Sequence, residues 1–170
     1  MLKFFGGVVE RVVIVGTALI FSQIPLFMQQ YEQQLVGRIG ELKLQIGAFT
    51  KAANGYSLDV YVEKFTSHND SFFVNHGEIL KGIIERYDSL KTSYATLESA
   101  SLLSKPFLFI SHAKADIALS TWTHFDLGLP LTMEGAVYAL FGVLAGMAII
   151  KLVCYPFKRR INRLKEKSAD

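Results

Sequence analysis

The chain has 170 residues, of which 51% are apolar and 19% charged, with a formal net charge of +3. Its single cysteine excludes an intramolecular disulfide. About 100 residues separate two long apolar blocks, which is enough for one small domain and excludes a larger architecture between them.

The first predicted element is the apolar block Val12 to Tyr31, VVIVGTALIFSQIPLFMQQY, which contains no charged residue. As a helix, roughly 20 residues cross about 30 Å of hydrocarbon. A signal peptide is the alternative because Lys3 precedes the block, but large residues stand where cleavage requires small ones. We predict an uncleaved transmembrane helix over 12–31 after a short cytoplasmic start at 1–11, with a kink at Pro25.

The helix is expected to continue beyond the membrane until Asn54-Gly55, a turn signal. Apolar residues recur at alternating four- and three-residue spacing, which is typical of a helix that packs along another helix. They are Met28, Leu35, Ile39, Leu42, Ile46, Phe49 and Ala53. A second face carries Gly37, Gly40 and Gly47, each of which lowers helix stability by about 1 kcal/mol. The predicted contacts with a second copy or a partner are therefore these glycines together with Leu35, Leu42 and Phe49.

Two further helical patterns follow in the middle of the chain. Ser57 caps a short segment with one apolar face, for which a strand over Val60–Val62 is the alternative. The longer segment, 71–103, repeats the four-three spacing. Its apolar or aromatic positions are His76, Leu80, Ile83, Tyr87, Leu90, Tyr94 and Leu97. Together the patterns predict an antiparallel helical hairpin within an extramembrane domain at 32–125, with its helices crossing at about 20°.

The next segment predicts a return of the chain to the bilayer. Pro106 is expected to begin a helix, and two short amphipathic stretches surround it. Trp122 and Phe125 stand shortly before the second apolar block, a position typical of membrane-interface aromatics. We expect these stretches to lie along the membrane surface or on the base of the hairpin, with Trp122 contacting the membrane surface.

The second apolar block predicts a transmembrane helix over 133–155, after a re-entry loop at 126–132 and with Thr132 as its N-cap. A buried core helix is the alternative. Gly142 and Gly146 form the small-x-x-x-small pattern of close helix contact. We predict that both glycines contact another copy or a partner protein.

Charge sets the predicted topology. The tail at 156–170 is basic, whereas the region from Phe27 to Leu131 carries nine Lys or Arg and eleven Asp or Glu, a local net charge of −2. Positive flanks stay in the cytoplasm, so we predict two cytoplasmic termini and a translocated middle, periplasmic in a Gram-negative bacterium. The tail is expected to contact anionic lipid through Lys158, Arg159 and Arg160. A basic run directly after a span is typical of a stop-transfer signal, so we do not predict nucleic-acid binding.

The sequence carries no familiar catalytic or metal motif. It contains no HExxH, no GxSxG and no glycine-rich phosphate loop. The four histidines, His68, His76, His112 and His124, do not pair four apart on a helix. We predict no enzyme, no cofactor and no metal site.

Two stretches resemble a known family. SQIPLFMQQYEQQL after the first span and GLPLTMEGAVYAL before the second are similar to a proteobacterial inner-membrane family, domain of unknown function 2937. The most specific positions are Gln23, Pro25, Gln29, Gln30, Tyr31 and the segment from Gly128 to Glu134. The resemblance implies a two-pass protein of the bacterial inner membrane, and it implies no activity.

The sequence therefore predicts an all-α membrane protein in which two transmembrane helices flank a helical hairpin. The expected function is structural: a homo-oligomeric scaffold, or an accessory subunit of an envelope complex, in contact with membrane lipids. The alternative is an oligomeric channel or transport component lined by Ser22, Gln23 and Glu134. An enzyme acting on lipid or peptidoglycan would need a catalytic pair that the sequence does not offer.

Overall fold

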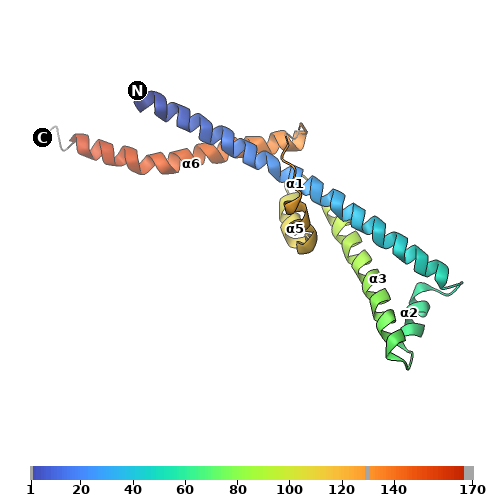
Figure 1. Ribbon diagram of the computed structural model, residues 1–170. Helices are drawn as coiled ribbons and strands as arrows, with labels where there is room; N and C mark the ends of the chain where they lie inside the picture. The colour runs from blue at the N-terminus through green and yellow to red at the C-terminus, as the bar shows by residue number, and fades with distance from the viewer. Residues whose placement is uncertain (1, 129–130, 167–170) are drawn as a thin grey trace. The chain divides into compact units, whose positions relative to one another are not determined.

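A computed structural model describes the backbone of residues 2–128 and 131–166 and the side chains of residues 7–128 and 131–153. Within these residues the protein is all-helical (Figure 1). The elements are α1 (Leu2–Ala52), α2 (Leu58–Thr66), α3 (Ser71–Glu98), α4 (Lys105–His112), α5 (Ala115–Thr123) and α6 (Met133–Glu166). The chain divides into two compact units: unit 1 combines Met1–Met28 with Asp126–Asp170, and unit 2 is Gln29–Phe125.

Helix α1 confirms the prediction of one long helix that continues past the first apolar block. It runs without interruption from Leu2 to Ala52, with Pro25 inside it. The turn predicted at its end is also confirmed: Asn54 and Gly55 have φ angles of 47° and 93°. These left-handed backbone conformations stop the helix and are favourable for glycine and tolerated by asparagine.

Both predicted spans are helices long and apolar enough to cross a membrane. Their most apolar 18-residue windows have mean hydropathies of 1.8 and 2.2, and only 17% of each window is buried. The core helix of a soluble protein would be mostly buried instead. The predicted cap of α6 is present as well, because the hydroxyl of Thr132 accepts a hydrogen bond from the amide of Gly135 at 3.1 Å.

Unit 2 contains the later part of α1 and the four shorter helices. Ser57 and Asp70 cap α2 and α3 through their side chains, accepting from the amides of Val60 and Phe72. Residue Pro106 lies in the first turn of α4, as predicted. The prediction that the third helix extends over 71–103 is wrong at its C-terminal end: α3 stops at Glu98, and the hydroxyl of Ser99 binds the carbonyl of Ala95 at 2.8 Å.

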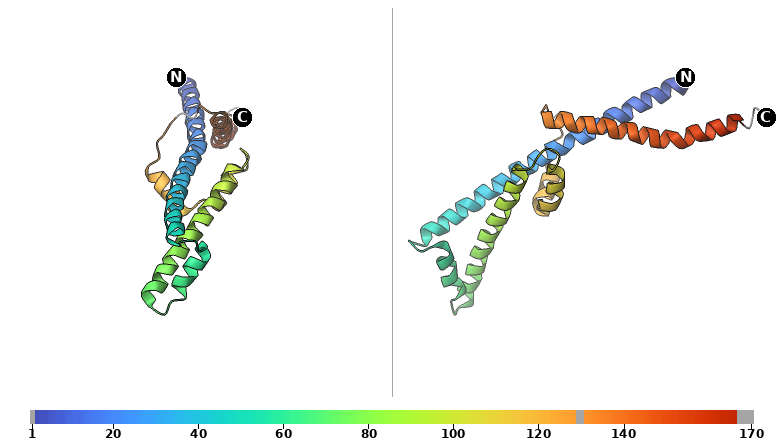
Figure 2. Two further views of the ribbon diagram at one scale, coloured as in Figure 1. Left: turned by 90° about the vertical axis from the view of Figure 1, so that its right-hand side faces the viewer. Right: turned by 180° about the vertical axis from the view of Figure 1, so that it is seen from behind.

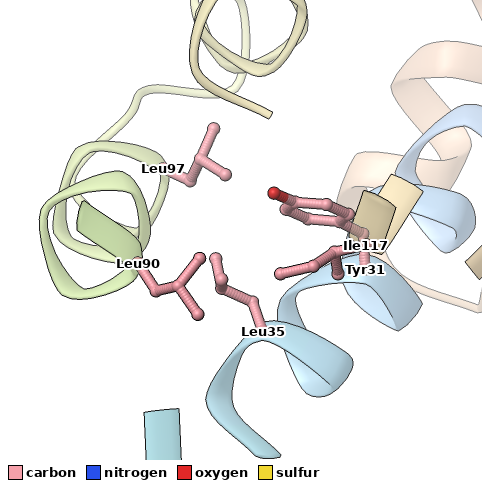
Figure 3. Packing of buried hydrophobic residues seen from close by; sticks show 5 residues of the cluster. All are labelled: Tyr31, Leu35, Leu90, Leu97 and Ile117. Atoms are coloured by element: carbon pink, nitrogen blue, oxygen red, sulfur yellow. The ribbon is translucent and has the colours of Figure 1, made fainter. Parts of the chain in front are cut away.

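The core of unit 2 joins α1, α3 and α5. Five buried side chains form it: Tyr31, Leu35, Leu90, Leu97 and Ile117. Figure 3 shows Leu35 facing Leu90, with Leu97 and the ring of Tyr31 beside them. Burial of each aliphatic side chain stabilises the unit by about 1.5–3 kcal/mol. The four-three spacing therefore places the correct residues in the core at this end of the hairpin.

The predicted packing along the full length of the hairpin is not observed. From the core, α1 and α3 diverge toward α2, as Figure 1 and the right-hand view of Figure 2 show. Helix α2 packs on α3 instead, where a Cβ at Gly77 would lie 2.8–2.9 Å from atoms of Phe65 and Thr66. Leu35 is buried, whereas Leu42 and Phe49, one and two heptads further, are only half-buried. His76, predicted on the apolar stripe, is exposed.

Candidate functional site

The closest helix contact in unit 1 lies at Gly142 on α6. A Cβ added there would lie 2.6 Å from the carbonyl oxygen of Thr17, 2.7 Å from Cα of Ala18 and 2.9 Å from Cβ of Phe21. These are backbone or backbone-proximal atoms that cannot rotate away. Helix α1 of the same chain therefore occupies the surface that the sequence assigned to another molecule.

Gly146 lies one turn further along the same face of α6. A Cβ there would collide with the hydroxyl of Thr17 and would lie 3.1 Å from Cα of Ile14. The Thr17 hydroxyl also donates within its own helix, to the carbonyls of Val13 and Ile14, both at 2.9 Å. Its polar atom is thus paired inside an apolar stretch.

A side chain of α1 holds the segment that leads into α6. The amide nitrogen of Gln23 donates to the carbonyl of Gly128 at 3.0 Å, and its oxygen accepts from the Gly128 amide at 3.3 Å. Gly128 also approaches Leu26, which lies 3.3 Å from the position of an added Cβ. The neighbouring Ser22 is buried, and its hydroxyl donates to the carbonyl of Leu19 at 2.7 Å. The polar residues at the end of the first apolar block therefore bond to backbone groups.

The glycine face predicted in unit 2 has no helix against it. A Cβ added at Gly37, Gly40 or Gly47 would have no atom of the described residues within 4 Å. Two large apolar side chains on the same part of α1 are also exposed, Val36 at 47% and Leu44 at 78%. Contact between this face and another molecule stays a prediction, but the chain itself leaves the face open.

Tyr31 is the residue that sequence reasoning missed. It is fully buried, its ring meets Phe109 edge-to-face at 4.9 Å, and its hydroxyl accepts a hydrogen bond from the amide of Lys114 at 2.8 Å. Lys114 is the N-cap residue of α5, and its side chain makes no capping hydrogen bond. Tyr31 thus fixes the corner between α4 and α5 on α1. An aromatic residue with a polar tip, placed at the end of an apolar block, was the available signal.

Two ion pairs support the same arrangement. Nζ of Lys105 lies 2.8 Å from Glu32, and both side chains are mostly covered. Arg86 and Asp116 lie 2.6 Å apart at a more exposed position. Burial acts to raise the pKa of Asp116, but the hydrogen bond and charge of Arg86 outweigh it and hold that pKa below its usual value. The pairs join α4 to α1 and α5 to α3.

The remaining predicted contacts are on or near α5 and α6. Trp122 is 70% exposed on α5. Lys158, Arg159 and Arg160 belong to the helical backbone of α6, but their side chains lie outside the described residues. Among the described residues, no group of three or more His, Cys, Asp or Glu is placed to hold a metal ion.

A family model described as Protein of unknown function (DUF2937) matches residues 5–163. The chain belongs to this family. The glycine contact of unit 1, the Gln23–Gly128 bond and the Tyr31 corner all lie within the matched residues. No curated protein and no solved structure matches the chain.

Proposed function

We propose that this member of the family is a two-pass integral membrane protein with a structural role, either as a homo-oligomeric scaffold or as an accessory subunit of an envelope complex. The observation that supports membrane insertion is the distribution of side chains in unit 1. Small residues line the contact between α1 and α6, and large apolar side chains face outward. The outward set includes Val12, Val15, Leu19, Ile20, Leu140, Leu144, Leu152 and Val153.

This distribution favours lipid over water as the surroundings. Exposed apolar surface is unfavourable in water by about 25 cal/mol per Å², whereas in a bilayer it carries no such penalty. Helices in lipid associate through close backbone packing at small residues, and a Cβ at Gly142 or Gly146 would break that packing. The hydroxyls of Thr17 and Ser22 bond to carbonyls of their own helix, which is how polar groups are accommodated in hydrocarbon.

The proposed compartment is the bacterial inner membrane, with both termini in the cytoplasm. The support is the charge distribution, with basic residues after the second apolar block and an acidic balance between the blocks. A cysteine placed at the exposed Asn69 should then react with a membrane-impermeant thiol reagent in intact spheroplasts. Labelling only after lysis would contradict the orientation.

Self-association is proposed through the later part of α1. The exposed face of Gly37, Gly40 and Gly47 leaves room for close approach of a second helix, and the adjacent Leu44 is 78% exposed. The channel alternative has weaker support. A pore needs polar side chains that face water, whereas Gln23 bonds to the backbone of Gly128 and Ser22 is buried.

The first experiment is extraction from native membranes. We expect the protein to stay in the membrane pellet in alkaline carbonate, and release into the wash would overturn the membrane proposal. In mild detergent, a single-protein particle of several 19.0 kDa copies would support the scaffold. A particle containing other proteins would support the accessory subunit, and a lone monomer would argue against both.

A glycine variant then tests the contact surface. Gly40→Leu adds bulk where the chain itself has nothing within 4 Å, so the monomer should fold and insert normally. We expect loss of the assembled particle. Gly82→Leu on α3 is the matched control, because it also adds bulk to an exposed helix position with nothing within 4 Å. Assembly retained in Gly40→Leu would refute the proposed contact. Gly142→Leu is less informative here because it disturbs packing inside unit 1.

A further inference from the structure

We infer that α4 and α5 form an interfacial foot: a pair of short helices that lies in the headgroup region of the bilayer and binds the lipid interface through its outer apolar face. This inference rests on the proposed membrane insertion. The surface concerned belongs to unit 2 but is not part of its core. We assign it to contact with the boundary between lipid headgroups and acyl chains.

The outer face of the foot is strongly apolar. Five large side chains within 20 residues are exposed: Leu103 65%, Phe107 75%, Ile110 81%, Leu119 65% and Trp122 70%. Phe107 and Ile110 are spaced i, i+3, so they share one side of α4, and Leu103 lies in the turn before that helix. Single exposed apolar residues need no explanation, but a set of this density marks an interaction surface.

The inner face of the same helices is committed to the core of unit 2. Ile117 is buried in the core, and Leu108, Phe109 and Ala118 pack against it. Lys105 is drawn inward to Glu32 at 2.8 Å. The foot therefore has two apolar faces: one packs on the core of unit 2, and the opposite one is exposed in the described part of the chain.

Polar groups on the foot are already paired with their own helices. The hydroxyl of Ser111 donates to the carbonyl of Phe107 at 3.1 Å, and that of Thr123 to the carbonyl of Ser120 at 2.9 Å. Hydroxyls bonded in this way are less costly to remove from water. Aromatic residues, with an apolar body and, in Trp122, a polar N–H, are suited to the interface.

The foot is bonded to the end of the first predicted span and is close along the chain to the second. Tyr31, the last residue of the predicted first span, binds the amide of Lys114 at 2.8 Å and packs on Phe109. The corner between α4 and α5 is thus attached where α1 leaves the bilayer. From the other side, only residues 124–132 separate α5 from the start of α6. Both connections to the predicted spans are short, and for this reason the inference commits to the bilayer rather than to a soluble protein partner.

The experiment uses the only tryptophan of the chain, Trp122. The full-length protein is reconstituted into phosphatidylcholine vesicles, with and without lipid brominated on the acyl chains close to the headgroup. We expect Trp122 emission to be blue-shifted and to lose most of its intensity with the brominated lipid. The double variant W122F/F107W moves the reporter to α4 and should behave in the same way.

Two further reporters separate the possible failures. W122F/F72W places tryptophan at a position of matched exposure, 71%, on α3, where we expect water-like emission and no quenching. W122F/L19W places it on the outward face of the first span. If L19W is quenched and neither foot reporter is, the interfacial foot is refuted and the membrane proposal stands. If L19W is not quenched either, membrane insertion itself fails. Quenching of F72W as strongly as Trp122 would also overturn the assignment.

Discussion

Gly142→Ala tests the packing of unit 1 with the smallest possible change. The added Cβ would lie 2.7 Å from Cα of Ala18 and 2.9 Å from Cβ of Phe21. Carbon atoms in contact prefer about 3.5–4.0 Å. Because neither partner atom lies at the end of a flexible side chain, α1 and α6 must separate by about 1 Å at this point.

The expected magnitude follows from a matched control. Gly16→Ala makes the same substitution in the apolar part of α1, where an added Cβ has nothing within 4 Å. Both variants gain the same helix propensity, about 1 kcal/mol in a soluble helix. Their difference therefore isolates the overpacking, for which about 1–3 kcal/mol is typical. We expect Gly142→Ala to be less stable than Gly16→Ala by this amount.

The assay must report helix separation, because membrane helices remain helical when they come apart. Dyes on Val9→Cys and Val153→Cys, in a chain with Cys154→Ser, place one label on α1 and one on α6 at exposed positions. Energy transfer is followed as SDS is titrated into mild detergent. If Gly142→Ala and Gly16→Ala lose transfer at the same SDS fraction, the contact at Gly142 is not the one that holds the two helices together.

Three further predictions concern bonds outside that contact. Gln23→Leu should speed hydrogen exchange at the amide of Gly128, because it removes the acceptor at 3.3 Å. Tyr31→Phe keeps the ring but removes the hydroxyl that caps α5, so it should lower the unfolding free energy of unit 2 by about 0.5–1.5 kcal/mol in urea titrations. The Asp116 pKa is lowered in the folded protein, so its ion pair stabilises above the unfolded pKa, and acidification below about pH 4 should weaken unit 2. Because the pair is exposed, this loss should reach no more than about 1 kcal/mol, and Arg86→Met should abolish it in urea titrations across that pH range.

The sequence predicted the helices well because their signals are local. The apolar blocks, the caps at Ser57 and Thr132, the Asn54-Gly55 turn and Pro106 each act on their own neighbours, and each is found where it was expected. The end of α3 was predicted too late, since residues 99–103 continue a helix-compatible composition. The helix nevertheless ends at Glu98, with Ser99 as its C-cap, and apolar periodicity does not locate such an end to within a few residues.

The glycines show where sequence reasoning stops. Gly142 and Gly146 were predicted to contact another molecule, yet α1 of the same chain packs against them. At Gly40, by contrast, an added Cβ has no described atom within 4 Å. A small-x-x-x-small pattern indicates close approach but not the identity of the approaching helix. Gly77 has a tighter environment than any glycine of the face predicted in unit 2 and lies in no such pattern. Only the three-dimensional arrangement distinguishes glycines that are used within the chain from those that remain open.

The polar residues at the end of the first apolar block have the clearest physical logic. If Gln23 and Tyr31 only marked the boundary between membrane and water, their polar groups would simply be solvated. In the structure, each instead bonds to a backbone group far along the chain, Gln23 to Gly128 and Tyr31 to Lys114. Gly128 lies in the loop before α6, and Lys114 lies just before the first turn of α5. The backbone groups that Gln23 and Tyr31 bind therefore have no hydrogen-bond partner within a helix. Leaving such backbone groups unpaired is unfavourable by about 1–3 kcal/mol each when water is scarce. Side chains that reach from α1 therefore stabilise the return of the chain toward the second apolar block. Substitution by leucine, which makes the first block more apolar, should still remove this stabilisation.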